Sequence, residues 1–415
     1  MKSRSLYPAL KSKSKNRFGR IIILTGARQT GKTTLVKKGF SDYTYLSIED
    51  PTLRSEYMQL TSSQWVSLYP KAVLDEIQKM PGLFESIKAV YDQYEKTRYI
   101  LLGSSQLLLL QKVRESLAGR CSIYEIFPLT IPELATSKWS ETVKKSLFQK
   151  FLIHKKLPQL HPSFKLSPDY PCATELFEFY LTFGGYPAIS ENALSDMERD
   201  EWLRNYIRTY LERDIRDLAD FKNLEPFLRI QQTTALLTGN MLNYSQLAKE
   251  ADITSNTAKK FITYLELSYQ TISLKPWYKN PLKRLHKSPK LHYLDPGIQR
   301  AILKKQGQIS GNEFESAVIA ELYKQTRYID FRGEFYHLRT LDGREIDLLI
   351  ETEEGYIAIE VKLTSRVNNS DARHLSGLDE ILDKPLLHSF ILSNDQKIRE
   401  IAPNITAIPA AMFIF

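Results

Sequence analysis

The fold of this chain is decided by residues 21–35, which read IIILTGARQTGKTTL. Residues Ile21 to Leu24 are apolar and predict a buried strand, and the residues after Lys32 can open a helix. Between them, residues 26–33 match the pattern G-x-x-x-x-G-K-[ST] in full. A strand before this pattern and a helix after it are what a phosphate-binding loop requires. That context disfavours the alternative, a glycine-containing turn that matches by chance.

Each residue type in this loop has a physical role toward a nucleoside triphosphate. Gly26 and Gly31 let the backbone bend, so that successive amide groups point at the phosphates. The helix that follows presents its positive end to the same phosphates. We expect Lys32 to contact the β- and γ-phosphates and the Thr33 hydroxyl to bind Mg²⁺. The predicted nucleotide-binding residues are Gly26, Ala27, Arg28, Gln29, Thr30, Gly31, Lys32, Thr33 and Thr34.

A pair of acidic residues ends another apolar segment, Ala72-Val-Leu-Asp-Glu76. In a parallel sheet their carboxylates would lie at the edge that carries the phosphate loop. We expect Asp75 to help hold Mg²⁺ and Glu76 to orient and deprotonate the attacking water. The alternative is a strand that ends in a solvated acidic turn, and the phosphate loop upstream disfavours it.

Two more residues are candidates for the same reaction. Ser104 or Ser105 follows the apolar segment 99–102 and can sense the γ-phosphate, although either serine can equally cap the next helix. Arg120 precedes another strand and is a candidate for stabilising phosphate charge in its own or a neighbouring subunit. The alternative for Arg120 is an ordinary surface residue.

Alternating strands and helices predict an α/β fold with a parallel sheet. The expected strands are residues 21–24, 43–48, 72–74, 99–102 and 122–127, with a helix over 82–94. We expect six regions: a basic tail (1–20), a P-loop NTPase core (21–138), a linker (139–172), a helical region (173–240), a winged helix-turn-helix (241–305) and an α/β nuclease-like domain (306–415).

Composition sets broad limits on this 415-residue chain. It lacks an apolar run of the roughly 20 residues that a membrane span needs, and its basic N-terminus lacks the apolar stretch of a secretory signal. Two cysteines cannot build a disulfide framework or a zinc site, so we expect a reducing cytoplasm. The net charge of +9 favours a polyanionic partner only weakly. Residues 1–20 hold seven Lys or Arg and no acid, and we favour a solvated tail over an arm that touches nucleic acid.

The nucleotide motifs together resemble a known family. GARQTGKTT, AVLDEIQKMP, LLGSSQLLLL and ESLAGRCSIYEIFPLTIPEL are similar to the AAA+-type ATPases of bacteria and archaea that pair AAA_14 with DUF4143. Residues 183–187 (FGGYP) and 206–215 (YIRTYLERDI) resemble the second region of that family. The resemblance covers residues 20 to 370 or so, and it implies ATP binding and hydrolysis with ATP and Mg²⁺ as cofactors. It says little about the purpose of that hydrolysis.

The middle of the chain is helical and mixed in charge. In the linker we expect one helix, over 141–154, and we interpret its histidines as surface residues. Residues 198–218 predict one long helix with alternating charges, which indicates a solvated face. Residues 243–266 predict a helix-turn-helix whose polar side can lie in a major groove, with a wing at 269–274. Residues 275–290 hold six Lys or Arg, which suits a phosphate backbone. The alternative is a winged-helix fold used only for packing or for protein contact.

The C-terminal part predicts a helix from Gly311 and two strands, 345–350 and 356–362, paired as a hairpin. Alternation places Glu360 and Lys362 on one face. With Asp347 they resemble the PD-(D/E)xK nuclease core, in which Asp347, Glu360 and Glu313 would hold Mg²⁺. Lys362 would steady the attacking water or the leaving phosphate without binding the metal. The alternative is a nuclease-like fold that has lost its activity or docks a partner.

Two functions of different class follow from the sequence. The first is an ATP-driven machine that acts on DNA, with metal-dependent DNA cleavage left open. The second is an ATP-regulated switch whose C-terminal part binds a protein partner. No membrane partner is expected, and a homo-oligomer is left open.

Overall fold

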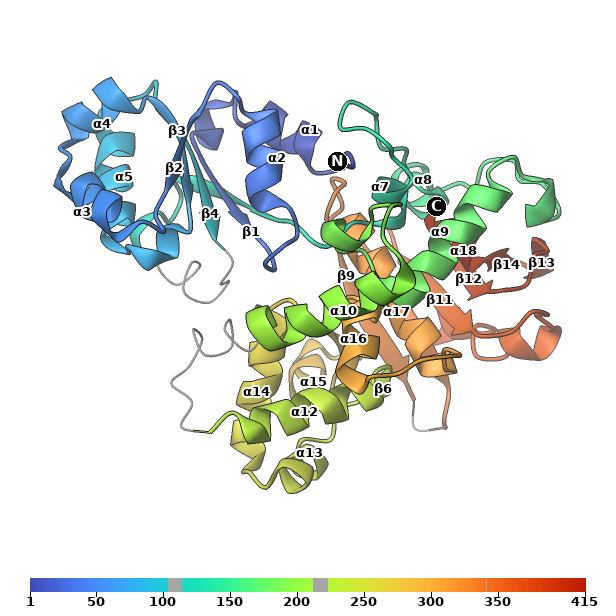
Figure 1. Ribbon diagram of the computed structural model, residues 1–415. Coiled ribbons are helices and arrows are strands. Elements are labelled where there is room, and N and C mark those ends of the chain that lie inside the picture. Colours follow the sequence, from blue (N-terminus) through green and yellow to red (C-terminus); the bar gives the residue numbers. More distant parts are fainter. Residues whose placement is uncertain (104–112, 114, 212–222, 341) are drawn as a thin grey trace.

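The computed structural model describes residues 1–103, 113, 115–211, 223–340 and 342–415. Figure 1 shows two sheet-containing bodies, an N-terminal one in blue and a C-terminal one in orange and red, with green and yellow helices beside the latter. The N-terminus of the chain lies between the two bodies. The α/β fold with a parallel-sheet core, followed by helices and a second sheet domain, is therefore confirmed.

The N-terminal body is a five-stranded parallel sheet with the strand order β2-β3-β4-β1-β5. All five expected strands are present, and the helix expected over 82–94 is α5. The elements are β1 (Ile21–Thr25), α2 (Lys32–Gly39), β2 (Thr44–Ser47), α3 (Pro51–Gln59), α4 (Ser62–Leu68), β3 (Lys71–Asp75), a 3₁₀ turn (Ile77–Lys79), α5 (Gly82–Gln93), β4 (Arg98–Gly103) and β5 (Cys121–Glu125).

Both faces of this sheet are covered, which explains why its strands are continuously apolar. Ile21 and Ile23 of β1 pack with residues of α3, α4 and α5 on one face. Ile22 and Leu24 pack with Leu35 of α2 on the other face. Alternate residues of one strand therefore serve two separate cores.

The basic N-terminal segment is not a solvated tail, and that prediction is wrong. It forms α1 (Tyr7–Lys13) and a 3₁₀ turn (Arg17–Gly19), and its Leu6 and Leu10 are buried beside α2 and β1. The guanidinium of Arg4 donates to the carbonyl of Phe127 at 2.6 Å and lies 3.5 Å from the carboxylate of Glu133. The lysines and arginines of this segment therefore did not show that the segment is exposed. The leucines between them are buried, and Arg4 itself makes a buried ionic contact.

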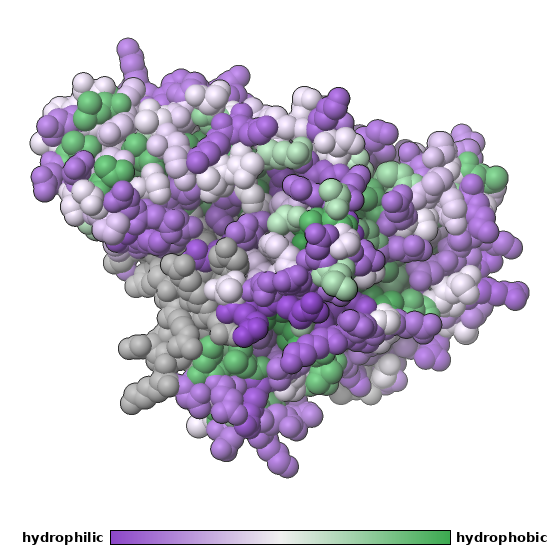
Figure 2. Space-filling view, in the orientation of Figure 1, coloured by the Kyte–Doolittle hydropathy of each residue, from purple (hydrophilic) through white to green (hydrophobic). Residues whose placement is uncertain are grey.

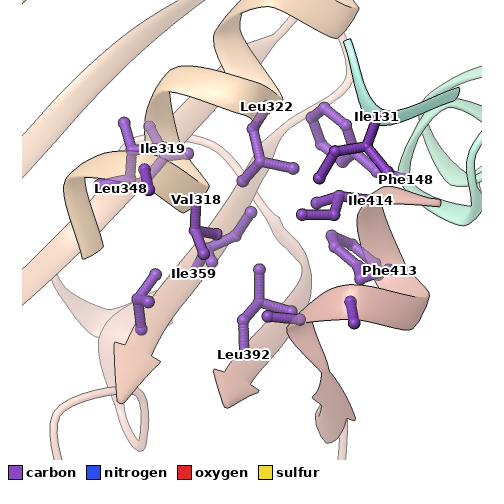
Figure 3. Packing of buried hydrophobic residues seen from close by; sticks show 14 of the residues in the cluster. Ile131, Phe148, Val318, Ile319, Leu322, Leu348, Ile359, Leu392, Phe413 and Ile414 are labelled. Atoms are coloured by element: carbon purple, nitrogen blue, oxygen red, sulfur yellow. The ribbon is translucent and has the colours of Figure 1, made fainter. Parts of the chain in front are cut away.

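The expected linker is also packed. Its helix is shorter than predicted, α8 (Leu147–His154), and α7 (Ile131–Leu134) and a 3₁₀ turn (Phe164–Leu166) lie near it in the chain. Ile131 and Phe148 are fully buried in the largest apolar core, against the C-terminal domain. Figure 3 shows these two side chains beside Leu322, Phe413 and Ile414. This stretch therefore belongs to the core of the C-terminal domain.

The helical region contains several helices rather than one long one. The described elements are α9 (Tyr170–Phe183), a 3₁₀ turn (Pro187–Ile189), α10 (Asp196–Tyr206), a π-helical turn (Ile207–Leu211) and α12 (Glu225–Leu236). The helix expected over 198–218 begins at Asp196, changes to π geometry at Ile207, and its last seven residues lie outside the described ranges. Figure 2 shows the hydrophilic surface over α10, as its mixed charges predict.

The helix-turn-helix is present as α13 (Tyr244–Ala251) and α14 (Ser255–Leu267). Leu247, Ala258, Phe261 and Leu265 point into one core, as predicted. The expected wing, β7 (Thr271–Pro276), is not a separate hairpin, since it pairs with β8 (Lys290–Tyr293) on one side and β9 (Gly333–Arg339) on the other.

The strands beside the helix-turn-helix and those of the C-terminal domain therefore form one hydrogen-bonded sheet of nine strands. Its order is β13-β14-β12-β11-β10-β9-β7-β8-β6. Its elements are β6 (Asn240–Met241), α15 (Pro281–His286), β8 (Lys290–Tyr293), α16 (Pro296–Leu303), α17 (Gly311–Thr326), β9 (Gly333–Arg339), β10 (Glu345–Thr352), β11 (Tyr356–Lys362), two 3₁₀ turns (Asn369–Ala372 and Leu378–Glu380), β12 (Leu386–Ser393), β13 (Arg399–Ala402), β14 (Ile405–Pro409) and α18 (Ala410–Ile414).

The C-terminal hairpin has the expected pairing, with β10 antiparallel to β11. Helix α17 lies over these strands, and Figure 3 shows its Val318, Ile319 and Leu322 facing Leu348 and Ile359. None of the helices in the described ranges combines the length and the apolar character that spanning a bilayer requires.

We predict that Arg4→Met destabilises the protein. The carboxylate of Glu133 is completely buried and accepts from the backbone amides of Ser5 and Thr130. Arg4→Met leaves these hydrogen bonds but removes the cation of a buried ion pair, which costs about 3–5 kcal/mol. Urea unfolding of the nucleotide-free protein measures the change in the free energy of unfolding. The matched control is Arg17→Met, whose ion pair with Glu95 is exposed on both sides and which should change stability little. Equal effects of the two substitutions would contradict a structural role for Arg4.

Candidate functional site

The phosphate-loop motif forms a loop between β1 and α2 whose glycines are needed for backbone reasons. Gly26 has φ 155° and Gly31 has φ 90°, values that residues with a Cβ rarely adopt. A Cβ on Gly26 would lie 2.2 Å from the carbonyl oxygen of Ile126, so a side chain has no room there. Gln29 also has positive φ, at 62°. The loop is thus held in a tight curve at the end of β1.

The lysine and the threonine of the loop each make side-chain hydrogen bonds at this edge of the sheet. Lys32 is buried, and its Nζ donates to the carbonyl oxygens of Gly26 and Ala27, each at 2.8 Å. The Thr33 hydroxyl donates to Oδ2 of Asp75 at 2.6 Å. A hydroxyl and a carboxylate in contact are oxygen ligands that suit Mg²⁺, so this pair fits the metal of a nucleotide complex. The structure therefore brings Thr33 and Asp75 together as the sequence predicts.

Glu76 follows Asp75 and has a left-handed backbone, with φ 58°. Such a conformation is uncommon for a residue with a side chain and costs energy, so it occurs where the surroundings impose it. The amide of Gln78 donates to Oε2 of Glu76 at 2.5 Å. Glu76 lines the same cavity as the loop.

That cavity has a volume of about 800 Å³, and three parts of the chain contribute to it besides the loop and Glu76. The N-terminal segment supplies Lys2 and Arg4, the segment after β5 supplies Leu129 and Ser137, and residues 187–193 follow from the helical region. The full lining is Met1, Lys2, Arg4, Arg28, Gln29, Thr30, Gly31, Lys32, Thr33, Thr34, Glu76, Leu129, Ser137, Pro187, Ala188, Ser190, Glu191, Asn192 and Ala193. Sequence analysis missed the contributions from outside the loop, because these segments meet only in the tertiary structure.

Tyr45 is a functional candidate that the sequence analysis also missed. Its hydroxyl donates to Oδ2 of Asp75 at 2.7 Å, the oxygen that also accepts from Thr33. Burial and the Asp75 carboxylate raise the pKa of Tyr45, so the phenol stays protonated and remains a donor. The signal that could have pointed to Tyr45 is its position on β2, the strand that pairs with β3, which ends at Asp75.

Two buried tyrosines connect the loop to the helical region. The hydroxyl of Tyr206, from α10, donates to the carbonyl oxygen of Arg28 at 3.1 Å. The hydroxyl of Tyr269, just after α14, lies 3.1 Å from the Thr25 hydroxyl and 3.3 Å from Glu125, at the ends of β1 and β5. Burial raises the pKa of Glu125 at this junction. The phosphate loop is therefore in direct contact with the helices that follow the N-terminal body.

A second group of charged side chains lies in the C-terminal domain, and we call it the carboxylate cluster: Glu315, Glu345, Asp347 and Glu360. The carboxylate of Asp347 accepts from the backbone amide of Val361 at 2.9 Å, across the β10–β11 hairpin. Lys362 lies 2.8 Å from Glu360, so these two residues share a face as predicted. Burial and the neighbouring Asp347 raise the pKa of Glu360 well above its ordinary value.

Glu313 does not belong to this cluster, and that prediction is wrong. It is the third residue of α17, and its backbone amide donates to the Ser310 hydroxyl. Its carboxylate accepts from the backbone amide of Ser310 at 2.6 Å and lies 2.6 Å from Nζ of Lys305. Glu315, two residues later, points about 200° around the helix and faces Asp347 instead. Burial, followed by the charge of Asp347, raises the pKa of Glu315 to about 8.

Lys290 of β8 completes the cluster, and nothing in the sequence indicated it. Its Nζ lies 2.7 Å from Glu315, 3.2 Å from Glu345 and 3.2 Å from Asp347. Burial lowers the pKa of Lys290, but the carboxylates of Asp347 and Glu315 outweigh it and raise the pKa above its ordinary value. The ammonium is therefore charged and enclosed.

Comparison with family models divides the chain into three matched parts. Residues 19–135 match the model of an AAA domain, AAA_14. Residues 174–308 match a domain of unknown function, DUF8612, and residues 310–413 match another, DUF4143. These matches support a P-loop ATPase. The DUF8612 match spans both the helical region and the helix-turn-helix.

Two proteins with similar sequences both carry the description "uncharacterized protein". Protein Rv2008c of Mycobacterium tuberculosis is 25% identical over 94% of this chain and 80% of its own length. Protein MJ1544 of Methanocaldococcus jannaschii is 23% identical over 80% of this chain and 72% of its own length. Among solved structures, the Walker-type ATPase of Pyrococcus abyssi is 13% identical with a TM-score of 0.45, over 72% of this chain and 95% of the other. A likeness at that level carries no argument about function.

Two candidates in the AAA domain have different outcomes. Ser104 and Ser105 lie outside the described residues, so the sensor role of Ser104 stays a prediction. Arg120 lies at the start of β5, whereas the phosphate loop follows the end of β1, which runs parallel to it. Five residues of strand span about 16 Å, and Arg120 instead pairs with Asp92 at 2.7 Å. A role for Arg120 at the phosphates of its own subunit is therefore wrong.

We predict that Tyr45→Phe weakens Mg²⁺-dependent nucleotide binding. The substitution removes the hydrogen bond that orients Asp75, and losing such a partner lowers metal affinity by about 10-fold or more. Titration of the Mg²⁺ requirement for binding of a fluorescent ATP analogue measures the effect. The control is Tyr43→Phe, which makes the same chemical change where β2 begins, away from Asp75. If both variants keep the wild-type Mg²⁺ requirement, Tyr45 does not position the metal ligand.

Proposed function

We propose that this chain binds Mg²⁺·ATP on residues 26–34 and hydrolyses it. The observation that carries this proposal is the 2.6 Å contact between Thr33 and Asp75, beside a cavity that Lys32 and Glu76 both line. A hydroxyl, a carboxylate, an ammonium and a second carboxylate at one sheet edge are the groups that phosphoryl transfer to water needs. The AAA domain match over residues 19–135 supports the same reaction class.

In this proposal each residue has one task. Lys32 exchanges its contacts with the Gly26 and Ala27 carbonyls for phosphate oxygens, to which its charge is better matched. Thr33 and Asp75 hold Mg²⁺, which neutralises charge on the phosphates. Glu76 accepts a proton from the attacking water, and Gln78 holds its carboxylate in place.

We further propose that the nucleotide state is passed to the helices through Tyr206 and Tyr269. Both hydroxyls bond the loop or the strand that carries it. When phosphates bind and the loop shifts, these two hydrogen bonds change length or break, and the helices that carry the tyrosines respond. The finer proposal is therefore coupling between ATP hydrolysis and the DUF8612 region.

DNA is the partner that we propose for the helix-turn-helix. Asn256, Lys259 and Lys260 are exposed on α14, where a recognition helix presents its side chains. The second candidate is an ATP-regulated switch that docks a protein. The stretch 275–290 favours that candidate, because Trp277 is buried, Arg284 pairs with Glu351 and Lys290 is enclosed, so fewer cations face outward than the sequence predicts.

A homo-oligomer remains part of the first proposal. In it, Arg120 would act on the nucleotide of a neighbouring subunit rather than its own. Cleavage of DNA by the C-terminal domain is not part of either proposal, because the enclosed Lys290 occupies the centre of the carboxylate cluster.

We predict that Glu76→Gln binds ATP but does not turn it over, and that Lys32→Ala binds none. The first variant keeps the cavity and removes the base, and the second removes the charge that holds the phosphates. Equilibrium binding of ATP and phosphate release, measured on the same samples, separate the two steps. Glu56→Gln, on the exposed surface of α3, is the matched control and should keep wild-type turnover. Wild-type turnover by Glu76→Gln would remove Glu76 from the role of base.

We predict that duplex DNA binds in a salt-dependent way, with a slope of about −0.9 in log affinity against log salt for each phosphate contact. The double substitution Lys259→Glu and Lys260→Glu should reduce both the affinity and the slope. The double substitution Lys96→Glu and Lys156→Glu makes the same change in charge on other elements and should reduce them less. ATPase activity with and without DNA then tests the coupling. If the wild type binds no DNA at low salt, the protein-docking switch remains.

A further inference from the structure

The carboxylate cluster already contains a cation, the ammonium of Lys290. Its side chain is 3% exposed, and three of the four carboxylates lie within 3.2 Å of Nζ. A lysine ammonium is a donor only: Nζ donates to Oε1 of Glu345 and to Oδ1 of Asp347, each at 3.2 Å, and lies 2.7 Å from Oε1 of Glu315. The ammonium therefore occupies the position between the carboxylates where a bound cation would lie.

This cation comes from a different part of the chain than the carboxylates. Lys290 is the first residue of β8, which pairs with β7 and β6 next to the helix-turn-helix. Glu315, Asp347 and Glu360 lie on α17, β10 and β11 of the DUF4143 region. The contact thus joins residues 174–308 to residues 310–413 through buried charge.

The arrangement does not fit a divalent metal. Among the residues that the structure describes, no three His, Cys, Asp or Glu side chains are grouped so that they could hold a metal ion. The acidic side chains that a nuclease would use for Mg²⁺ are instead engaged by Lys290 and, at Glu360, by Lys362. The resemblance to a nuclease core thus extends to residue types and strand order but not to a metal site.

We propose that Lys290 is the resident cation of the carboxylate cluster, and that it excludes divalent ions from the C-terminal domain and fastens that domain to the helix-turn-helix. A divalent ion would have to share the cluster with an ammonium that lies within 3.2 Å of three acidic side chains, and like-charge repulsion between the two cations opposes this. The C-terminal domain is then a metal-free module as long as β8 stays in place.

The test compares Mn²⁺ binding by the nucleotide-free wild type and by Lys290→Met, with electron paramagnetic resonance as the measurement. Methionine keeps the length of the side chain and removes its charge. We expect the variant to gain a Mn²⁺ site that the wild type lacks, and Asp347→Asn added to the variant should abolish it. Lys362→Met is the matched control, since it removes an ammonium from the rim of the cluster and leaves Lys290 in place.

Because Lys290→Met can fail to fold, a second measurement uses the wild type alone. Reductive methylation followed by peptide mass spectrometry reports how fast each lysine reacts. Lys290 should react more slowly than Lys362, which is 39% exposed, and Mn²⁺ should leave its rate unchanged.

Three results would overturn the proposal. The first is a wild-type Mn²⁺ site that Asp347→Asn removes. The second is a faster reaction of Lys290 when Mn²⁺ is present. The third is a folded Lys290→Met that gains no Mn²⁺ site. None of these results depends on ATP hydrolysis, so failure here is distinguishable from failure of the proposed ATPase.

Discussion

The nucleotide site depends on the parallel alignment of β1, β4 and β3. Because the three strands run the same way, the loop after β1 and the acids that end β3 reach the same edge of the sheet, although β4 lies between them. Helix α2 then carries Thr33 across that edge to within hydrogen-bond distance of Asp75. Strands of the opposite direction would place the two motifs at opposite edges, with no common site.

The loop also depends on segments outside the sheet. The N-terminal segment and residues 187–193 complete the walls of the cavity, and Tyr206 and Tyr269 contact the loop and its strand. These contacts involve backbone carbonyl and hydroxyl groups, which are sensitive to small displacements of the loop. The N-terminal body is therefore joined to the rest of the chain at the site itself. The walls of the cavity come from both the N-terminal body and the segments that follow it.

The C-terminal domain is organised by buried charge as well as by apolar packing. Its apolar core includes Ile131 and Phe148 from the segment after the AAA domain, so that segment is part of the domain's structure. On the other side, the nine-stranded sheet joins it to the helix-turn-helix, and Lys290 adds a buried ionic contact there. A buried ion pair adds little net stability, but it fixes the position of its partners, since any shift leaves charge unpaired.

The sequence by itself determined the local features. The five strands, the phosphate loop, the acidic pair, the two helices of the helix-turn-helix and the β10–β11 hairpin follow from periodicity and motif spacing, which are properties of short segments. Only the tertiary structure decided that residues 1–20 are packed, that Tyr45 donates to Asp75, that Arg120 lies at the opposite end of its strand from the phosphate loop, and that Glu315 rather than Glu313 meets Asp347. It also decided that Lys290 fills the carboxylate cluster. Each of these depends on which distant segments come into contact, and burial and pairing between distant segments leave no periodic signal in the chain.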